Sequence, residues 1–178
     1  MRVITGSARG RKLITLEGDE VVRPTTDRVK EALFSIIQFE LDDASVLDLF
    51  AGSGQLGIEA LSRGASKATF IDKSRDAFEV IKQNLKITDF FSQSVVLNSD
   101  SFVFLLNSRE KYNIIFIDPP YNNGLAEKAL PGAANVCSDN GIIICETDKK
   151  EELPELAGDF KKFKEYNYSK TKLTTYRK

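Results

Sequence analysis

Four consecutive residues, Asp118-Pro119-Pro120-Tyr121, combine a carboxylate, a stiff backbone and an aromatic ring. They follow the apolar segment 112–117, which is predicted to be a buried strand that ends in a turn. Open α/β sheets bind ligands at the carboxyl ends of their parallel strands. The prolines fix φ and remove N–H donors, so nearby carbonyls are left to face a ligand. With Asp118 as acceptor and Tyr121 as a flat surface, the segment suits a planar group that carries an amine.

A second motif follows the predicted strand 45–50. The segment Gly52-Ser53-Gly54-Gln55-Leu56-Gly57 fits the pattern G-x-G-x-x-G and opens a predicted helix. Glycines at such a turn let a ligand approach the backbone without meeting a Cβ atom. Asp72 ends the next predicted strand, eighteen residues after Gly54, where an acid would meet ribose hydroxyls. On these features alone, NAD is a candidate ligand.

Acids at neighbouring strand ends argue against a dinucleotide. Asp48 precedes the glycine turn, where a carboxylate would repel a pyrophosphate and attract a cation. Asp100 follows the third predicted strand, where it either meets the ligand or caps a helix that begins near Ser101. Together with Asp72, these acids suit a nucleoside that carries positive charge. S-adenosylmethionine, which has an ammonium and a sulfonium group, fits better than NAD.

The order of predicted elements indicates an α/β fold. A helix is expected from Asp27, capped by Thr25 or Thr26. Further helices are expected at 55–63, 74–87, 101–109 and 125–138, and strands at 45–50, 67–72, 94–98, 112–118 and 141–147. Pro131 is expected to disturb the last helix. Strands that alternate with helices predict a mostly parallel sheet with helices on both faces.

Both ends of the chain are expected to form β-hairpins. The N-terminal extension, residues 1–22, contains short strands at 2–5 and 12–16 around a glycine-containing turn, and the C-terminal hairpin covers 160–177. With 178 residues, the chain is expected to be one domain, 1–178.

Composition excludes several classes of protein. No apolar stretch approaches the length of about 20 residues that a membrane span needs, and the N-terminus lacks a signal-peptide core, so a cytoplasmic protein is expected. The chain has no histidine, which excludes histidine-dependent triads and histidine-ligated metals, and no metal site is expected. Cys137 and Cys145 lie among apolar residues and are expected to be reduced packing residues.

Charge is unevenly distributed along the chain. Residues 1–30 hold seven Lys and Arg against four Asp and Glu, and residues 160–178 hold seven against one. The segment between them, 31–159, carries a net charge of −10, since the whole chain carries −1. Basic ends indicate either nucleic-acid contacts or a solvated surface. The lysine-rich tail either adds a second contact or shields a sheet edge.

The motifs resemble those of the RsmD family, which comprises bacterial methyltransferases that act on guanine in small-subunit ribosomal RNA. This family lies in the class I superfamily of S-adenosylmethionine-dependent enzymes. The resemblance spans nearly the whole chain and rests on the segments 2–6, 10–13, 23–34, 48–54, 56–65 and 118–121 with 124–125. The block Arg23-Pro24-Thr25-Thr26-Asp27-Arg28 and its spacing to Asp118 distinguish this family from the wider superfamily.

The resemblance implies a Rossmann-like fold with a seven-stranded sheet, and methylation of the exocyclic 2-amino group of a guanine in 16S ribosomal RNA. The substrate partner would be that RNA or an assembling small subunit, and the enzyme is expected to be a monomer. Asp118, Pro119, Pro120 and Tyr121 would receive the base. The cofactor would be held by Asp48, Phe50, Ala51, Gly52, Gly54, Asp72, Lys73, Asp100 and Ser101. The expected RNA contacts are Arg9, Arg11 and Lys12 on the extension, with Arg23, Arg28 and Lys30 near the mouth of the site.

Two departures from the family pattern stand out. Gln55 occupies a position where many members have a small residue, and Ser169 replaces a glycine in the predicted turn of the C-terminal hairpin.

Two other functions are kept open. The Asp-Pro-Pro-Tyr motif also serves enzymes that methylate adenine in DNA, although 178 residues leave no room for a separate target-recognition domain. The same enzyme class could act on another RNA. A more distant alternative is an RNA-binding assembly module that binds the cofactor weakly.

Overall fold

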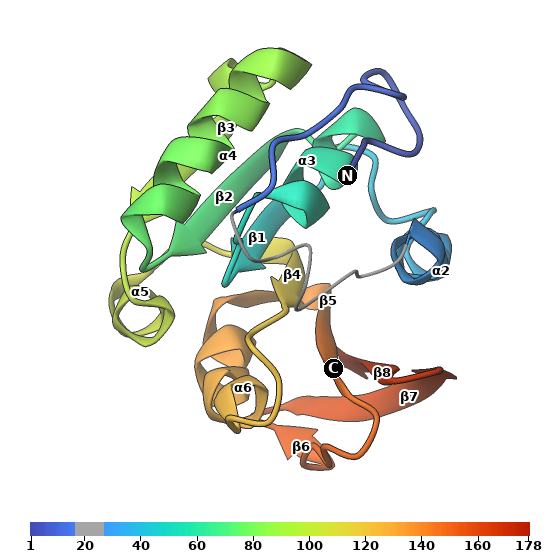
Figure 1. Ribbon diagram of the computed structural model, residues 1–178. Helices are drawn as coiled ribbons and strands as arrows, with labels where there is room; N and C mark the ends of the chain where they lie inside the picture. The colour runs from blue at the N-terminus through green and yellow to red at the C-terminus, as the bar shows by residue number, and fades with distance from the viewer. Residues whose placement is uncertain (17–26) are drawn as a thin grey trace.

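The computed structural model describes residues 1–16 and 27–178, which form a mixed eight-stranded sheet between two layers of helices (Figure 1). The spatial order of the strands is β3-β2-β1-β4-β5-β8-β7-β6. The parallel part comprises β1 (Ser45–Leu49), β2 (Lys67–Asp72), β3 (Ser94–Asn98), β4 (Tyr112–Ile117) and β5 (Cys137–Asp148). The antiparallel part comprises β6 (Leu156–Ala157), β7 (Phe160–Tyr168) and β8 (Thr171–Arg177).

The helices cover both faces of the sheet, as the alternating pattern predicts. One face carries α2 (Asp27–Ile36), α3 (Gln55–Ser62) and α4 (Arg75–Thr88). The other carries α5 (Ser101–Asn107) and α6 (Leu125–Val136), and a short 3-10 helix, η1 (Phe91–Gln93), precedes β3. None of the helices in the described part of the chain combines the length and the apolar character that crossing a membrane requires.

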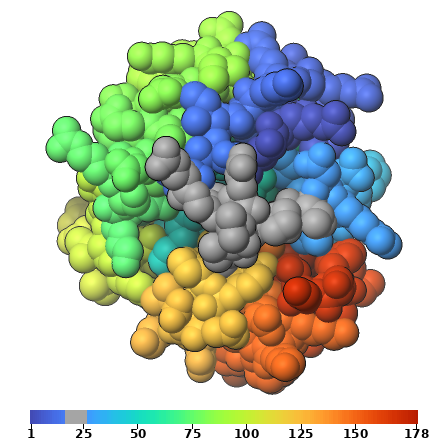
Figure 2. Space-filling view, in the orientation of Figure 1, coloured from blue at the N-terminus to red at the C-terminus, as the bar shows by residue number. Residues whose placement is uncertain are grey.

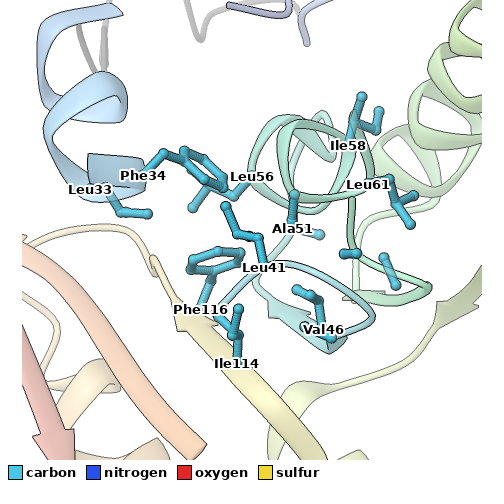
Figure 3. Packing of buried hydrophobic residues seen from close by; sticks show 14 of the residues in the cluster. Leu33, Phe34, Leu41, Val46, Ala51, Leu56, Ile58, Leu61, Ile114 and Phe116 are labelled. Carbon is cyan, nitrogen blue, oxygen red and sulfur yellow. The ribbon is translucent and has the colours of Figure 1, made fainter. Parts of the chain in front are cut away.

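Each layer of helices has its own hydrophobic core. On the α2 side, Leu33 and Phe34 pack toward Ile114 and Phe116 of β4, and the rings of Phe34 and Phe116 meet edge to face at 5.7 Å (Figure 3). The cluster on the α6 side contains alternate residues of the same strands, such as Ile115. Since successive side chains of a strand point to opposite faces, near-continuous apolar strands such as β4 supply both cores.

The chain order creates a crevice between β1 and β4. From β1 the chain builds outward through β2 and β3, and it then returns to place β4 on the other side of β1. Ligands bind at this kind of switch point in open α/β sheets. Leu49 lies beside Ile117 in register, so the segments that follow β1 and β4 leave the sheet side by side.

Most expected elements are confirmed, and the C-terminal hairpin forms as β7 and β8. The expected seven-stranded sheet is wrong by one, because the two-residue strand β6 adds an eighth. Pro131 lies inside α6 without ending it, and the helix stops at Val136 because β5 begins at the next residue. The expected caps Thr25 and Thr26 lie outside the described residues.

The N-terminal β-hairpin does not form. Residues 1–16 make one isolated antiparallel bridge, between Arg2 and Lys12. Backbone donors that a hairpin ladder would use are taken by helix side chains instead. The N–H groups of Ile4 and Thr5 donate to the Glu59 carboxylate of α3 at 2.8 and 3.0 Å, and that of Ile14 donates to Asn84 of α4 at 2.8 Å. The segment is therefore a loop held against these helices, between α2 and α4 on the surface (Figure 2).

Candidate functional site

A cavity of about 300 Å³ opens at the carboxyl ends of the parallel strands. It brings together most of the predicted cofactor residues with part of the predicted base-binding segment. The predicted residues that line it are Asp48, Phe50, Ala51, Gly52, Asp72, Lys73, Asp100, Ser101, Asp118 and Pro120. Gly54, Pro119 and Tyr121 are not among the lining residues.

The glycine turn exposes backbone to this cavity. Phe50, Gly52 and Gly54 have φ values of 60°, 55° and 78°, in the left-handed region. A Cβ atom added at Gly52 would meet nothing within 4 Å, so the open space beside this residue is available to a ligand. Gly57 differs, because a Cβ atom there would lie 2.3 Å from the ring of Phe70. The third glycine of the motif therefore allows α3 to pack closely on β2.

Asp72 fixes the shape of the turn from the neighbouring strand. One carboxylate oxygen accepts a hydrogen bond from the Gly52 N–H at 2.9 Å, and the other accepts from the Ser74 N–H at 2.8 Å. Each carboxylate oxygen can accept more than one hydrogen bond. Asp72 is thus positioned both to hold the turn and to accept hydroxyl groups of a bound nucleoside.

Asp48 is buried at the base of the cavity, with 2% of its surface exposed. Its carboxylate accepts a hydrogen bond from the Gly57 N–H at 2.9 Å. Burial raises the pKa of Asp48 to about 8 against the opposing effect of this hydrogen bond, and the charge of Asp72 raises it further. At neutral pH the carboxyl is therefore mainly protonated in the absence of a ligand, and a cation in the cavity would favour the charged form.

Asp100 has the capping role that its position allows. Its carboxylate accepts hydrogen bonds from the N–H groups of Phe102 and Val103 at 2.9 and 3.1 Å, at the start of α5. Phe102 then meets Phe50 edge to face, with ring centroids 6.0 Å apart, and both rings line the cavity. Acids on one side, apolar rings on another and open backbone at Gly52 fit a nucleoside with a cationic group.

The segment after β4 divides its residues between the cavity and the sheet. Asp118 and Pro120 line the cavity, whereas Pro119 is buried. The Tyr121 hydroxyl donates to Glu146 Oε1 of β5 at 2.8 Å and lies 3.1 Å from Thr171 Oγ1 of β8. Burial and the neighbouring Glu146 raise the pKa of Tyr121, so its hydroxyl keeps its proton at neutral pH. The strands beside β4 thereby fix the hydroxyl end of the Tyr121 ring.

Comparison with known proteins identifies the family. The family model described as Conserved hypothetical protein 95 matches residues 1–177. Ribosomal RNA small subunit methyltransferase D of Escherichia coli is 39% identical over 90% of this chain and 81% of its own length. YlbH of Bacillus subtilis, which is named only provisionally as an rRNA methyltransferase, is 38% identical over 100% of this chain and 99% of its own length.

The chain belongs to the RsmD family of methyltransferases. Its cofactor is S-adenosylmethionine. Among solved structures, the YhhF methyltransferase of Escherichia coli superposes with a TM-score of 0.89 at 36% identity, covering 100% of this chain and 97% of the other.

For this RsmD-family chain, the expected RNA-binding residues have different surroundings. Arg9, Arg11, Lys12 and Arg28 are exposed, and Arg11 donates to the backbone carbonyl of Ile87 at the end of α4. Arg23 lies outside the described residues.

Lys30 corrects one prediction. It is fully buried, donates to the Arg2 carbonyl at 2.8 Å and lies 3.6 Å from Glu59 Oε2. Burial of the ammonium group lowers the pKa of Lys30. Lys30 is therefore a structural partner of α3 rather than an RNA contact.

Sequence reasoning missed part of the site of this RsmD-family member. The additional lining residues are Met1, Leu16, Ser53, Gln55, Leu56, Phe102 and Leu125. Phe102 carried a usable signal, since an aromatic residue two positions after a strand-end acid lies beside the same cavity. Glu146 and Thr171 carried none, because they reach Tyr121 from strands far along the chain.

Proposed function

We propose that this chain transfers a methyl group from S-adenosylmethionine to the exocyclic 2-amino group of a guanine in 16S ribosomal RNA. One observation carries the proposal. In a chain of the RsmD family, the glycine turn after β1 and the segment Asp118-Pro119-Pro120-Tyr121 after β4 open onto the same cavity. A donor and an acceptor held there would meet at the switch point of the sheet.

The residues around the glycine turn would hold the cofactor. Asp72 would accept hydrogen bonds from the ribose, Asp100 and the ring of Phe102 would contact the adenine, and Asp48 would face the cationic methionine part. When bound, S-adenosylmethionine supplies an electrophilic methyl group on a positively charged sulfur. The open backbone at Gly52 admits this part without a steric clash.

The segment after β4 would prepare the acceptor. A guanine 2-amino group is a poor nucleophile because its lone pair is delocalised into the ring. Asp118 and the Pro119 carbonyl would accept its N–H hydrogens and direct the lone pair toward the methyl group. As the nitrogen–carbon bond forms and the sulfur–carbon bond breaks, Asp118 would stabilise the positive charge on nitrogen and could then receive the proton.

Alignment supplies much of the rate in such a reaction, so rigid positioning matters. The prolines restrict the backbone beside Asp118, and the tether from Tyr121 to Glu146 restricts the other end of the segment. The ring of Tyr121 would stack against the target base. The base must be unpaired or turned out of its helix to enter the cavity.

The experiment offers radiolabelled S-adenosylmethionine with naked 16S RNA, assembled small subunits or DNA. Label in RNA, recovered as N2-methylguanosine after digestion, is the expected result. The Asp118→Ala variant should abolish transfer while retaining cofactor affinity, and Asp159→Ala is the control because Asp159 is exposed and pairs with Lys178. Label in DNA alone, or full activity of Asp118→Ala, would overturn the proposal.

A further inference from the structure

We propose that RNA nucleotides next to the target base lie along one face of the C-terminal hairpin. This inference rests on the proposed function and specifies how its substrate is held. The surface, called here the hairpin face, consists of Lys161, Lys164, Tyr166 and Tyr168 of β7 with Lys170 of the following turn. Its occupant would be single-stranded RNA, bound through phosphates and stacked bases.

The strand register places the hairpin face beside the acceptor segment. Tyr168 pairs with Thr171 and Tyr166 pairs with Leu173, and paired residues of antiparallel strands point to the same side of the sheet. Tyr166 and Tyr168 pack against the cluster that contains Leu173, which confirms the side. Thr171 in turn contacts the Tyr121 hydroxyl at 3.1 Å. The acceptor segment and Tyr168 are therefore separated by a single residue of β8.

The two faces of the hairpin treat their lysines differently. Lys162 and Lys172, on the opposite face, are neutralised by Glu155 at 2.8 Å and Glu152 at 3.1 Å. Within the described ranges 1–16 and 27–178, no acidic side chain comes within 4.0 Å of the hairpin-face lysines. Positive charge on the hairpin therefore remains uncompensated on the side next to the site.

Rings and cations alternate along the hairpin face. Lys164 Nζ lies 4.9 Å from the centre of the Tyr166 ring, and both tyrosine rings are half-buried, so each is held in place while an edge stays accessible. Ordered rings next to exposed cations bind single-stranded nucleic acid through stacking and phosphate contacts. The central segment 31–159 carries a net charge of −10, which leaves this basic end as a favourable approach for a polyanion.

The test compares variants of the full-length enzyme on 16S RNA over a range of salt concentrations. In the double variant Lys164→Gln, Lys170→Gln, we expect KM for RNA to rise about 10-fold at unchanged kcat, and the salt dependence of binding to fall by roughly one per lost phosphate contact. Tyr168→Leu keeps apolar packing against the core but removes the ring, and should weaken RNA binding by about 10-fold.

Two controls separate this effect from folding and from cofactor binding. Lys67→Gln removes one exposed lysine at the opposite end of the parallel strands, where Lys67 pairs with Glu110, and should leave KM unchanged. Affinity for S-adenosylmethionine and the thermal unfolding midpoint should match those of the wild type in every variant.

The outcomes distinguish this inference from the proposed function. If the wild type labels no RNA, the proposed function fails. If the wild type labels RNA and the hairpin-face variants keep its KM and salt dependence, the hairpin face is not an RNA surface. Loss of activity on assembled subunits with normal activity on naked RNA would indicate contact with a ribosomal protein, and would overturn the inference as well.

Discussion

The Tyr121 hydroxyl donates a hydrogen bond of 2.8 Å to Glu146, which is almost fully buried in β5. This bond ties the segment that would receive the base to the centre of the sheet. Removing it with Tyr121→Phe should lower the free energy of unfolding by about 1–2 kcal/mol, because a buried carboxylate loses a donor. We also expect kcat to fall about 10-fold at unchanged cofactor affinity, because alignment of the acceptor is lost.

Tyr176→Phe is the matched control for that experiment. The Tyr176 hydroxyl donates to the Pro154 carbonyl at 2.6 Å, on the α6 side of the sheet. The control should lose similar stability in urea titrations and keep its single-turnover rate. Equal rates for the two variants would show that the Tyr121 tether serves folding alone.

The buried carboxyl of Asp48 should make stability depend on pH. Because its pKa rises from 3.8 to about 8 on folding, its destabilising effect is absent below pH 4 and grows as pH rises toward 8. The ligand-free wild type should lose roughly 3–5 kcal/mol over this interval through Asp48. Asp48→Asn, whose side-chain oxygen can still accept from the Gly57 N–H, should show a smaller loss in urea titrations at pH 4, 6 and 8. Parallel curves for the two proteins would contradict this assignment.

The buried ion cluster around Glu59 should be essential for stability. Glu59 lies 2.9 Å from Arg63 Nε and 3.6 Å from Lys30 Nζ, and it holds the N–H groups of Ile4 and Thr5. Glu59→Gln leaves the buried Lys30 without its charge partner, so we expect a loss of about 3–5 kcal/mol in chemical denaturation. Glu79→Gln, which removes one side of an exposed pair with Lys82, should cost less than about 1 kcal/mol.

The hairpin turn offers a test in the stabilising direction. Ser169 has φ = 33°, a left-handed value that glycine adopts more easily than serine. Ser169→Gly restores the family residue and should leave stability unchanged or raise it by up to about 1 kcal/mol. Ser169→Val should destabilise the protein, since a β-branched side chain is strained at positive φ. A more stable valine variant in thermal unfolding would refute this account of the turn.

The sequence predicted the central elements well because their signals are local. Each parallel strand is an apolar run bounded by a turn, and each following helix opens with a cap or a glycine. The strand-end acids of the site could be predicted for the same reason, since the end of a strand fixes the edge on which its next residue lies. The strands β5 and β8 were also found, although their partners are not evident from local pattern.

The errors have a common physical cause. The N-terminal hairpin, Lys30 and the role of Tyr121 all depend on polar partners that are far away in the chain. Glu59 takes the backbone donors of Ile4 and Thr5 and also pairs with Lys30, and these contacts override local β-hairpin and surface-lysine preferences. β6 escaped prediction because two residues carry too little periodicity to be recognised.

The cavity lies where the two hydrophobic cores come closest to each other. Ala51 and Leu56 belong to the core on the α3 side, whereas Phe50 and Phe102 pack against the core on the α6 side, and all four line the cavity. An occupant would touch both layers of the molecule at once. Amide hydrogen exchange should therefore slow together in α3 and in α5 when the cofactor binds, although the sheet lies between these helices.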